Sequence, residues 1–163
     1  MKKSNAIRDR IFKPEELKQE VIRQRLKSKT IAFTNGVFDI LHEGHIEVLS
    51  QAAGFADMLI VGINSDASVK RLKGDSRPVN NENSRVLIIA SLIMVDAVVI
   101  FDEDTPLELI KIIKPDVLIK GGDYTIETIV GAKEVISGGG KVEVIPLKPG
   151  FSTTGIIDKI SGN

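Results

Sequence analysis

The chain of 163 residues contains no cysteine, which excludes a disulfide scaffold, a cysteine-ligated zinc ion and a thiol nucleophile. It also lacks net charge, because 22 Lys and Arg balance 22 Asp and Glu, so composition predicts no nucleic-acid or membrane partner. Aromatic residues are scarce at 4%. The most apolar stretch, Val86–Phe101, is shorter than the ~20 residues of a membrane span, and Asp96 interrupts it.

Hydrophobic residues at 42% and charged residues at 27% are typical of a soluble protein with a buried core. The length predicts one domain, residues 1–163, with a basic helical flank over 1–28 and a catalytic α/β core over 29–163. No apolar stretch follows Lys2 and Lys3, so the sequence does not begin like a secretory signal. We expect a cytoplasmic protein.

The basic N-terminal segment is the main asymmetry of the sequence. Residues 1–30 hold ten Lys or Arg and four Asp or Glu, a net charge of +6. Apolar residues recur among these charges at helical intervals, which favours a solvated amphipathic helix. A nucleic-acid-binding arm is the alternative, but the segment contains a single aromatic residue, Phe12, and therefore no base-stacking platform. Salt-dependent binding of DNA or RNA that is lost when residues 1–28 are removed would favour that alternative.

Short Ile- and Val-rich runs alternate with amphipathic stretches along the rest of the chain. Runs without polar alternation are typical of strands buried on both faces, and their alternation with helices predicts a parallel sheet with right-handed crossovers. We therefore expect a Rossmann-like α/β fold, an open parallel five-stranded sheet with helices on both faces. The predicted strands are Thr30–Thr34, Met58–Ile63, Ala97–Phe101, Val117–Lys120 and Val142–Pro146. The predicted helices are His45–Ala56, Asp66–Leu72, Asn83–Met94, Pro106–Ile113 (with Thr105 as its N-cap and Glu108 completing a capping box), Ile126–Ser137 and Thr153–Ile160.

Four loops follow the carboxyl ends of these strands, and ligands of open parallel sheets bind at those ends. The loops span residues 35–45, 64–80, 121–123 and 150–154. They are rich in Gly, Lys, Arg, His and hydroxyl residues, and they include helix N-termini whose amides are free to bind anions. The sequence therefore predicts an anion site at this edge, most plausibly for phosphate.

The only two histidines, His42 and His45, are three residues apart at a loop-to-helix junction, so both can lie on one side of the first helical turn. Two imidazoles so placed can donate hydrogen bonds to one phosphate or bind a metal. A metal site would need a third ligand, such as Asp39 or Glu43, and the spacing differs from the zinc-protease pattern. We expect no metal-binding residues.

Cations in the second loop indicate a mobile segment that closes over a polyphosphate, with Lys73 and Arg77 at its ends and Lys70 and Arg85 as weaker candidates. Arg71 is expected to be a solvated surface residue. Ser152, Thr153 and Thr154 exceed what helix capping requires, which favours phosphate binding at that helix start. The run Gly138–Lys141 precedes a strand and lacks the hydroxyl of a P-loop, so it is interpreted as a plain turn.

These motifs resemble a known superfamily. Gly36-Val37-Phe38-Asp39 followed by His42-Glu43-Gly44-His45 resembles the G-x-F-D-x-x-H-x-G-H signature of the H-x-G-H nucleotidyltransferases, and Ser152-Thr153-Thr154 resembles their late Ser/Thr motif. The segments 34–39, 61–66, 77–80 and 120–124 further resemble the adenylyltransferases of ADP-heptose synthesis, over roughly residues 30–160. In many relatives this module follows a sugar kinase domain, so the sequence resembles the stand-alone form. One departure is Ile157, where many superfamily members have an Arg.

The resemblance implies transfer of AMP from ATP to D-glycero-β-D-manno-heptose 1-phosphate, with Mg²⁺ accompanying the ATP, in lipopolysaccharide core heptose synthesis. Alternatives are a glycerol-3-phosphate cytidylyltransferase, a heptose-phosphate guanylyltransferase and a non-catalytic nucleotide-binding regulator. A homodimer through the apolar helix around Leu87–Met94 stays open beside a core role for that helix. The expected catalytic residues are His42, His45, Lys73 and Arg77; the expected nucleotide-binding residues are Asn35, Gly36, Val37, Phe38, Asp39, Gly44, Gly122, Asp123, Ser152, Thr153 and Thr154; and the expected substrate-binding residues are Asn64, Asp66, Lys70, Asn80 and Arg85.

Overall fold

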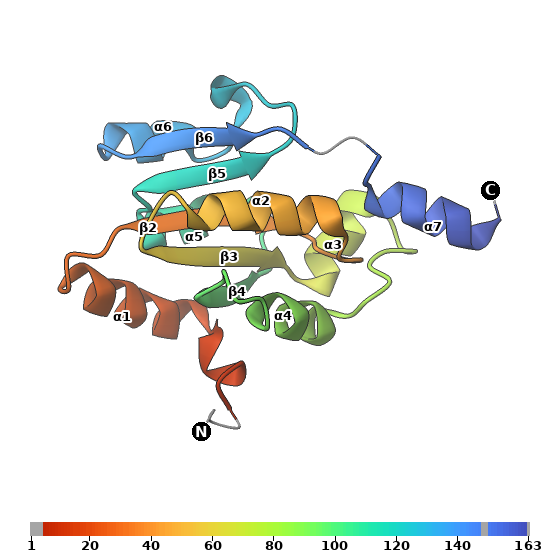
Figure 1. The fold of residues 1–163 in the computed structure, drawn as a ribbon, viewed down its shortest axis with the longest axis horizontal. Coiled ribbons are helices and arrows are strands. Elements are labelled where there is room, and N and C mark those ends of the chain that lie inside the picture. The colour runs from red at the N-terminus through yellow and green to blue at the C-terminus, as the bar shows by residue number, and fades with distance from the viewer. Residues whose placement is uncertain (1–4, 148–149, 163) are drawn as a thin grey trace.

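The computed structural model of the protein describes residues 5–147 and 150–162. All pairings between neighbouring strands are parallel, in the order β1-β4-β3-β2-β5-β6 (Figure 1). The predicted open parallel α/β sheet is therefore confirmed. The strands are β1 (Ile11–Phe12), β2 (Ile31–Gly36), β3 (Met58–Asn64), β4 (Ala97–Phe101), β5 (Val117–Gly121) and β6 (Lys141–Ile145).

The expected number of strands, five, is wrong, because the sheet has six. The additional strand β1 lies in the basic N-terminal segment, where Ile11 and Phe12 pair with Val98 and Val99 at the edge of the sheet. A strand of two residues is too short to produce a periodic pattern, and the surrounding charges have helical spacing. Helix α1 (Pro14–Arg25) follows directly. It is amphipathic and buries Leu17 and Val21, which lie one turn apart.

The helices match the predicted stretches with shifted ends. Helix α5 begins after Pro106 without a side-chain cap, so the expected Thr105 cap is wrong, and Glu108 instead pairs with Lys111 at 2.7 Å. The stretch predicted as one helix over 126–137 is divided, because Gly131 adopts a φ of 86° and a Cβ there would lie 2.4 Å from Ile110. The remaining helices are α2 (Glu43–Ala53), α3 (Asp66–Lys73), α4 (Glu82–Ala90), α5 (Leu107–Ile113), α6 (Ala132–Ser137) and α7 (Thr153–Ser161), with short 3₁₀ turns η1 (Arg8–Arg10) and η2 (Ile126–Thr128).

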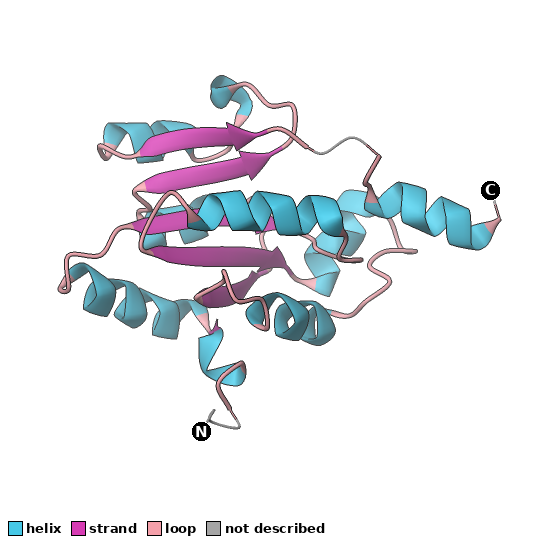
Figure 2. Cartoon of the chain, in the orientation of Figure 1, coloured by secondary structure: helices cyan, strands magenta, loops and turns pink. Residues whose placement is uncertain are grey.

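Two hydrophobic cores lie on the two faces of the sheet, as predicted for a doubly covered sheet. Helices α2 and α4 cover one face and α1, α5 and α6 cover the other (Figure 2). The strand residues alternate between the cores: Phe33 and Ile60 pack with the α1–α5 side, whereas Ala32 and Val61 pack with the α2–α4 side. Because every strand runs in the same direction, the loops after β2, β3, β5 and β6 all leave the same edge.

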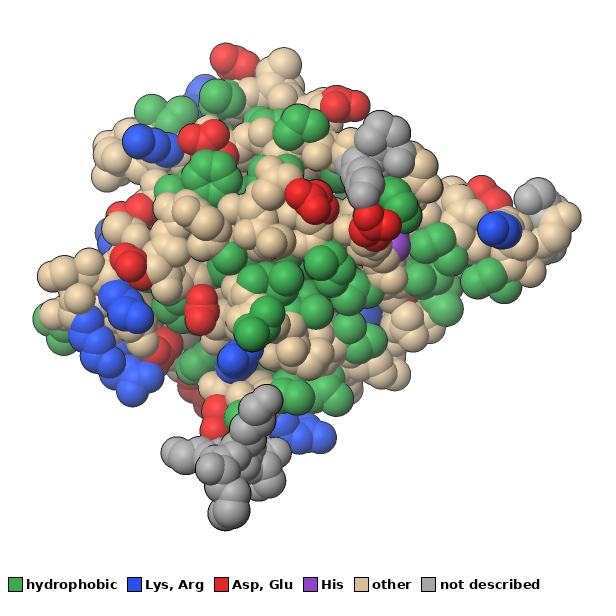
Figure 3. All heavy atoms as spheres, in the orientation of Figure 1, with side chains coloured by type: hydrophobic (Ala, Val, Ile, Leu, Met, Phe, Trp, Pro, Cys, Tyr) green, Lys and Arg blue, Asp and Glu red, His purple; other side chains and the backbone are tan. Residues whose placement is uncertain are grey.

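Two apolar surfaces remain outside these cores. Helix α7 extends beyond the carboxyl edge of the sheet, and Ile160 on it is 78% exposed (Figure 1). Near α4, Leu87 and Ile88 are partly exposed and Ile93 is 90% exposed, and apolar side chains gather between α2 and α4 on this face (Figure 3). Among residues 5–147 and 150–162, no helix combines the length and apolar character needed to cross a bilayer.

Candidate functional site at the carboxyl edge of the sheet

The two histidines lie against each other at the start of α2. Their ring centroids are 3.8 Å apart with an interplanar angle of 22°, so the rings stack. His42 is the N-cap residue of α2, and His45 lies in its first turn. The expectation that both lie on one side of the first helical turn is therefore confirmed. Both Nδ1 atoms are buried, and among residues 5–147 and 150–162 neither has a hydrogen-bond partner, a state that is costly for a polar atom.

Residues from the end of the chain complete the surroundings of this histidine pair. The Phe151 ring lies 6.4 Å from the His42 ring, and Thr153 Oγ1 donates to the carbonyl oxygen of Ile40 at 3.4 Å. Gly44 permits this close packing, because a Cβ at this position would lie 3.1 Å from His42 Nδ1 and 3.3 Å from Phe151 Cβ. The start of α7, where Ser152 Oγ accepts a hydrogen bond from the Gly155 amide at 2.9 Å, is thus held beside the histidines.

Burial makes both histidines poor bases. It lowers the pKa of His42, and it lowers the pKa of His45 to about 4, with smaller contributions from His42 and the Lys73 ammonium. The effect of Lys73 shows that the end of α3 lies close enough to act electrostatically on His45. At neutral pH the pair therefore consists of two neutral imidazoles, each with one N–H to donate.

Asp39 lies at the centre of a second group, which fixes the segment after α3. Its buried carboxylate accepts hydrogen bonds from Arg77 Nε at 2.7 Å and from the Val79 and Asn80 amides at 2.8 to 3.0 Å. Burial alone would raise the pKa of Asp39, but these donors hold it below the ordinary value. Asn80 Nδ2 also donates to the Asp39 carbonyl oxygen at 2.6 Å. Arg77, expected to contact phosphate, is therefore engaged with Asp39 and ties the 74–80 segment to the loop after β2.

Arg85 differs most from its expected role. Its side chain is fully buried, and its guanidinium donates to the carbonyl oxygens of Asn80 and Val37 at 2.9 and 2.7 Å and to Asp66 Oδ1 at 2.7 Å. A group without exposed surface cannot meet a diffusing substrate in this conformation. Arg85 therefore acts here as a support that joins the loop after β2, the 74–80 segment and the start of α3.

Of the other predicted substrate residues, Asp66, Asn80 and Asn64 are bonded to protein groups. Asp66 is paired with Arg85, and Asn80 is bonded to Asp39, while Lys70 is exposed on α3. Asn64 is buried at the end of β3, where its Nδ2 donates to Ser68 Oγ at 3.0 Å. Arg71 is exposed and pairs with Asp104 at 2.8 Å, in keeping with its expected surface role.

A cavity of about 400 Å³ lies at the carboxyl ends of β2, β3 and β5, under the start of α5 and the turn η2. Of the predicted residues, it is lined by Asn35, Gly36, Val37, Asn64 and Lys73. Gly122 and Asp123 follow β5 close by, and Asp123 is exposed.

Sequence reasoning missed two residues that line this cavity, Lys120 and Tyr124. Lys120 Nζ lies 3.4 Å from Asn35 Oδ1 and 5.6 Å from the centre of the Tyr124 ring. The sequence placed Lys120 at the end of a strand and both residues in the 120–124 segment of the family resemblance, but it assigned neither of them a role in the site. Its position, a single lysine ending an otherwise apolar strand directly before two glycines, was the available signal.

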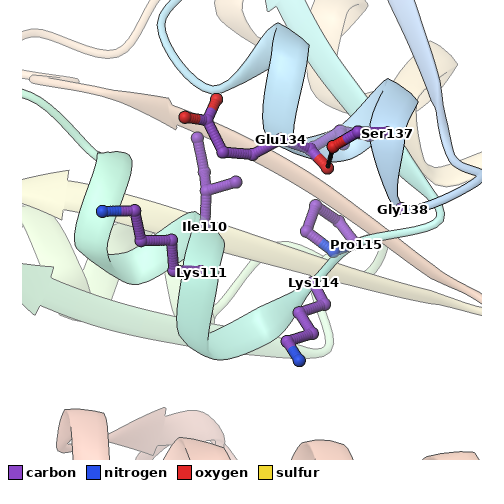
Figure 4. A pocket seen from close by; sticks show the side chains of 8 residues that line it. Ile110, Lys111, Lys114, Pro115, Glu134, Ser137 and Gly138 are labelled. Carbon is purple, nitrogen blue, oxygen red and sulfur yellow. Dashed lines mark hydrogen bonds between the residues drawn. The ribbon is translucent and has the colours of Figure 1, made fainter.

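A separate cavity of about 300 Å³ lies at the opposite edge of the sheet between α5 and α6. Figure 4 shows Lys114 directed away from Glu134 and Ser137, so the polar groups around this cavity do not converge on one point. Residues 138–140 form the turn before β6 at this same edge, as predicted, and Lys141 is the first residue of the strand. Within residues 5–147 and 150–162, no group of three or more His, Cys, Asp or Glu could hold a metal ion.

Comparison with known proteins places these features in a family. The chain is 56% identical over 144 residues to the bifunctional protein HldE of Koribacter versatilis and 57% identical over 143 residues to that of Paramagnetospirillum magneticum. Each match covers 88% of the chain but only 30% and 29% of the relative, so the chain spans less than a third of the length of these proteins.

Two solved structures share the fold. The lipopolysaccharide core biosynthesis protein of Thermoplasma volcanium aligns with a TM-score of 0.59 and 29% identity over 74% of the chain and 97% of that protein. The pantoate-beta-alanine ligase of Francisella tularensis aligns with a TM-score of 0.61 over 94% of the chain and 78% of that protein, and at 20% identity it supports the fold alone. Residues 33–159 match the cytidylyltransferase-like family, which confirms the resemblance of the H-x-G-H motif: the chain belongs to this family of nucleotidyltransferases.

Proposed function

We propose that the protein transfers AMP from ATP to D-glycero-β-D-manno-heptose 1-phosphate, giving ADP-heptose and pyrophosphate for lipopolysaccharide core synthesis. The observation that carries this proposal is the stacked pair of neutral histidines at the start of α2, beside the hydroxyl-bearing start of α7. The choice of substrate rests on the likeness to the HldE proteins and to the lipopolysaccharide core biosynthesis protein.

The chemistry of this reaction suits a site that has donors and cations but no strong base. An oxygen of the sugar phosphate forms a bond to the α-phosphorus of ATP, and the bond from that phosphorus to the bridging oxygen of pyrophosphate breaks. The second pKa of a phosphate monoester is about 6, so the nucleophile is already largely a dianion at neutral pH. Catalysis then consists of alignment and of stabilising charge that develops on the leaving pyrophosphate.

In this proposal His42 and His45 donate hydrogen bonds to the ATP phosphates. Neutral imidazoles can bind there without a prior proton, and the negative charge of the phosphates would raise the pKa of both rings toward the ordinary value. The Val37 and Phe38 amides meet the α-phosphate side of the nucleotide, and Lys73 neutralises phosphate charge from the end of α3. Gly122, Asp123 and residues 152–154 hold the rest of the nucleotide.

The Asp39–Arg77 pair takes a supporting role in the proposal. Because both groups bond each other, Arg77 contributes to the reaction by holding the 74–80 segment closed over the loop after β2. Mg²⁺ fits as an ion bound mainly by phosphate oxygens and water, since the Asp39 carboxylate nearest the site is taken up by three protein donors. We further propose that the chain works as one domain in the cytoplasm, with residues 29–163 as its catalytic core.

The proposal is tested by measuring pyrophosphate release from ATP, CTP and GTP with heptose 1-phosphate and with glycerol 3-phosphate as acceptors. We expect ATP with heptose 1-phosphate to give the highest kcat/KM. Turnover of CTP with glycerol 3-phosphate instead would replace the proposed substrates, and turnover of GTP with heptose 1-phosphate would replace the base. Nucleotide binding without turnover of any pair would favour a regulator.

The role of the histidines is tested by His45→Gln, with His42→Gln as its partner and Lys133→Met as a surface control. Loss of one oxyanion-type donor is expected to reduce kcat by about 100- to 1000-fold. If His45→Gln folds normally and keeps kcat within about threefold of the wild type, the histidine pair does not contact the reacting phosphates.

A further inference from the structure

The cavity that Lys120 lines lies on the opposite side of the β2–α2 loop from the histidines. Its walls come from the ends of β2, β3 and β5 and from the α5 side of the sheet, whereas the histidines start α2, which covers the other face. Gly36 and Val37 line the cavity and also lead into the loop that carries the histidines. A ligand in the cavity would therefore approach the nucleotide loop from the side away from the histidine pair.

The position of this cavity follows from the strand order. The chain proceeds from β2 to β3 and β4 on one side, and then returns to place β5 on the other side of β2. At such a switch point the loops after the two central strands separate, and this crevice is where open parallel sheets bind ligands. Asn35 and Lys120 are each the next-to-last residue of their strands, β2 and β5, so this pair marks the switch point.

Lys120 is a partly buried cation without a nearby carboxylate. Within the described part of the chain, no carboxylate lies within 4.0 Å of its ammonium, and its recorded contacts are the Asn35 amide oxygen and the Tyr124 ring. Asp104 also lines the cavity, but it is paired with Arg71. Burial lowers the pKa of Lys120, because the charged form lacks compensation. A phosphate would supply that compensation.

Tyr124 gives the same cavity an apolar, flat surface. Its ring lies over the backbone at Gly122, where φ is 134° and a Cβ would come within 2.7 Å of the ring. The residue remains 47% exposed, so one side of it is available to a ligand. An aromatic face next to amide groups such as Asn35 and Asn64 is typical of sites that bind a ring bearing hydroxyl groups.

We propose that this cavity binds the acceptor as a sugar 1-phosphate, with the phosphate on Lys120 and the sugar ring against Tyr124. The inference rests on the proposed nucleotidyl transfer and adds the acceptor site to it. It replaces the expected acceptor contacts of Asp66, Asn80 and Arg85, which are bonded to protein groups. It also replaces that of Lys70, which is exposed on α3 outside the cavity lining. This placement also suits in-line displacement, in which the attacking acceptor oxygen and the leaving pyrophosphate oxygen lie on opposite sides of the α-phosphorus.

The test compares Lys120→Met and Lys120→Arg with Lys111→Met, an exposed lysine paired with Glu108 away from the cavity. Pyrophosphate release is measured at saturating ATP over a range of heptose 1-phosphate, and ATP affinity is measured separately by calorimetry. Loss of a charged contact predicts a rise of about tenfold or more in the acceptor KM for Lys120→Met. ATP affinity is expected to change less than twofold, and Lys120→Arg is expected to retain most of the acceptor affinity.

Tyr124→Ala tests the sugar side, with Tyr124→Phe as the control that keeps the ring. We expect Tyr124→Ala to raise the KM for heptose 1-phosphate several-fold and to leave any residual use of glycerol 3-phosphate, which has no ring, unchanged. An unchanged acceptor KM in Lys120→Met together with weaker ATP binding would assign Lys120 to the nucleotide and overturn the inference.

A binding experiment separates this inference from the proposed function. If the wild type releases no pyrophosphate with any acceptor, the proposed function fails, and D-mannose 1-phosphate is titrated against D-mannose in the presence of a non-hydrolysable ATP analogue. Binding of only the phosphorylated sugar, lost in Lys120→Met and kept in Lys111→Met, supports the cavity as a sugar-phosphate site. No binding to the wild type, or equal binding to Lys120→Met, overturns it.

Discussion

Replacing Arg85 by Met tests whether this residue supports the site or contacts the substrate. The guanidinium is fully buried and donates three hydrogen bonds, to the carbonyl oxygens of Val37 and Asn80 and to Asp66. Methionine fills a similar volume but leaves two carbonyl oxygens and one carboxylate without their donor. Breaking a buried ion pair in this way costs about 3–5 kcal/mol. Since the Asp66 side chain is 32% exposed and can be hydrated, we expect the lower end, about 3 kcal/mol.

The free energy of unfolding is measured by urea titration, followed by circular dichroism because the chain contains no tryptophan. A loss of about 3 kcal/mol corresponds to a fall in Tm of roughly 6–12 °C for a chain of this size. Arg71→Met, at an exposed surface pair, is the control and is expected to change stability by at most about 1 kcal/mol. Lysine cannot reach three acceptors at once, so Arg85→Lys should lose most of the same stability.

The opposite result would restore the role that sequence reasoning gave to Arg85. If Arg85→Met unfolds within about 1 kcal/mol of the wild type while the acceptor KM rises tenfold, the guanidinium must face the ligand in solution. The buried network would then not describe the working enzyme, and Asp66 and Asn80 would return as acceptor residues beside it.

Three further predictions concern the neighbouring groups. Asp39→Asn should release Arg77 and the 74–80 segment, which limited proteolysis would detect as faster cleavage there than in Asp75→Asn, an exposed control. Gly122→Ala and Gly139→Ala, both at positive φ, should each lose about 1 kcal/mol of stability from backbone strain, but only Gly122→Ala should raise the acceptor KM, because only there does a Cβ meet Tyr124. The pKa of His45 is about 4 in the folded protein and near 6.5 when unfolded, so protons bind the unfolded chain first as the pH falls. The free energy of unfolding should therefore decrease between pH 6.5 and 4. In urea titrations across that range, His45→Gln should show a smaller decrease than the wild type.

The sequence predicted the central sheet well because β3 and β4 are nearly continuous apolar runs and because β2 and β5 each begin with one. Strand β6 at the edge differs, since Lys141 and Glu143 alternate with its valines. The two-residue strand β1 could not be predicted, because its pairing depends on β4, which is more than eighty residues away. The start of α5 was misplaced for a different reason. The Thr-Pro-x-Glu pattern is typical of a capped helix start. In the structure Glu108 accepts a hydrogen bond from Lys111 one turn later instead, and the sequence pattern is equally compatible with that pairing.

For the site, the sequence identified the loops but not the partner of each side chain. The stacking of His42 and His45 follows from their spacing on one helix, and it was therefore predictable. The partners of Arg77 and Arg85 are set by residues 38 and 48 positions away, so spacing gave no information on them. Both arginines carry the charge that phosphate binding needs, and in both the protein itself supplies the acceptors.

The cations at the carboxyl edge of the sheet fall into two groups, those already paired with protein acceptors and those that are not. Arg77 and Arg85 satisfy buried carboxylates and carbonyls, so their charge is already neutralised before any ligand arrives. Among the residues that the structure describes, the polar and aromatic contacts of the Lys120 ammonium are the Asn35 amide oxygen and the Tyr124 ring, so a bound anion can still stabilise its charge. For phosphate binding, the unsatisfied group matters more than the number of positive charges in a loop. By this criterion the histidine pair and Lys120 are the groups with most to gain from phosphate, and the loop Gly36–Val37 between them is where the α-phosphorus would be attacked.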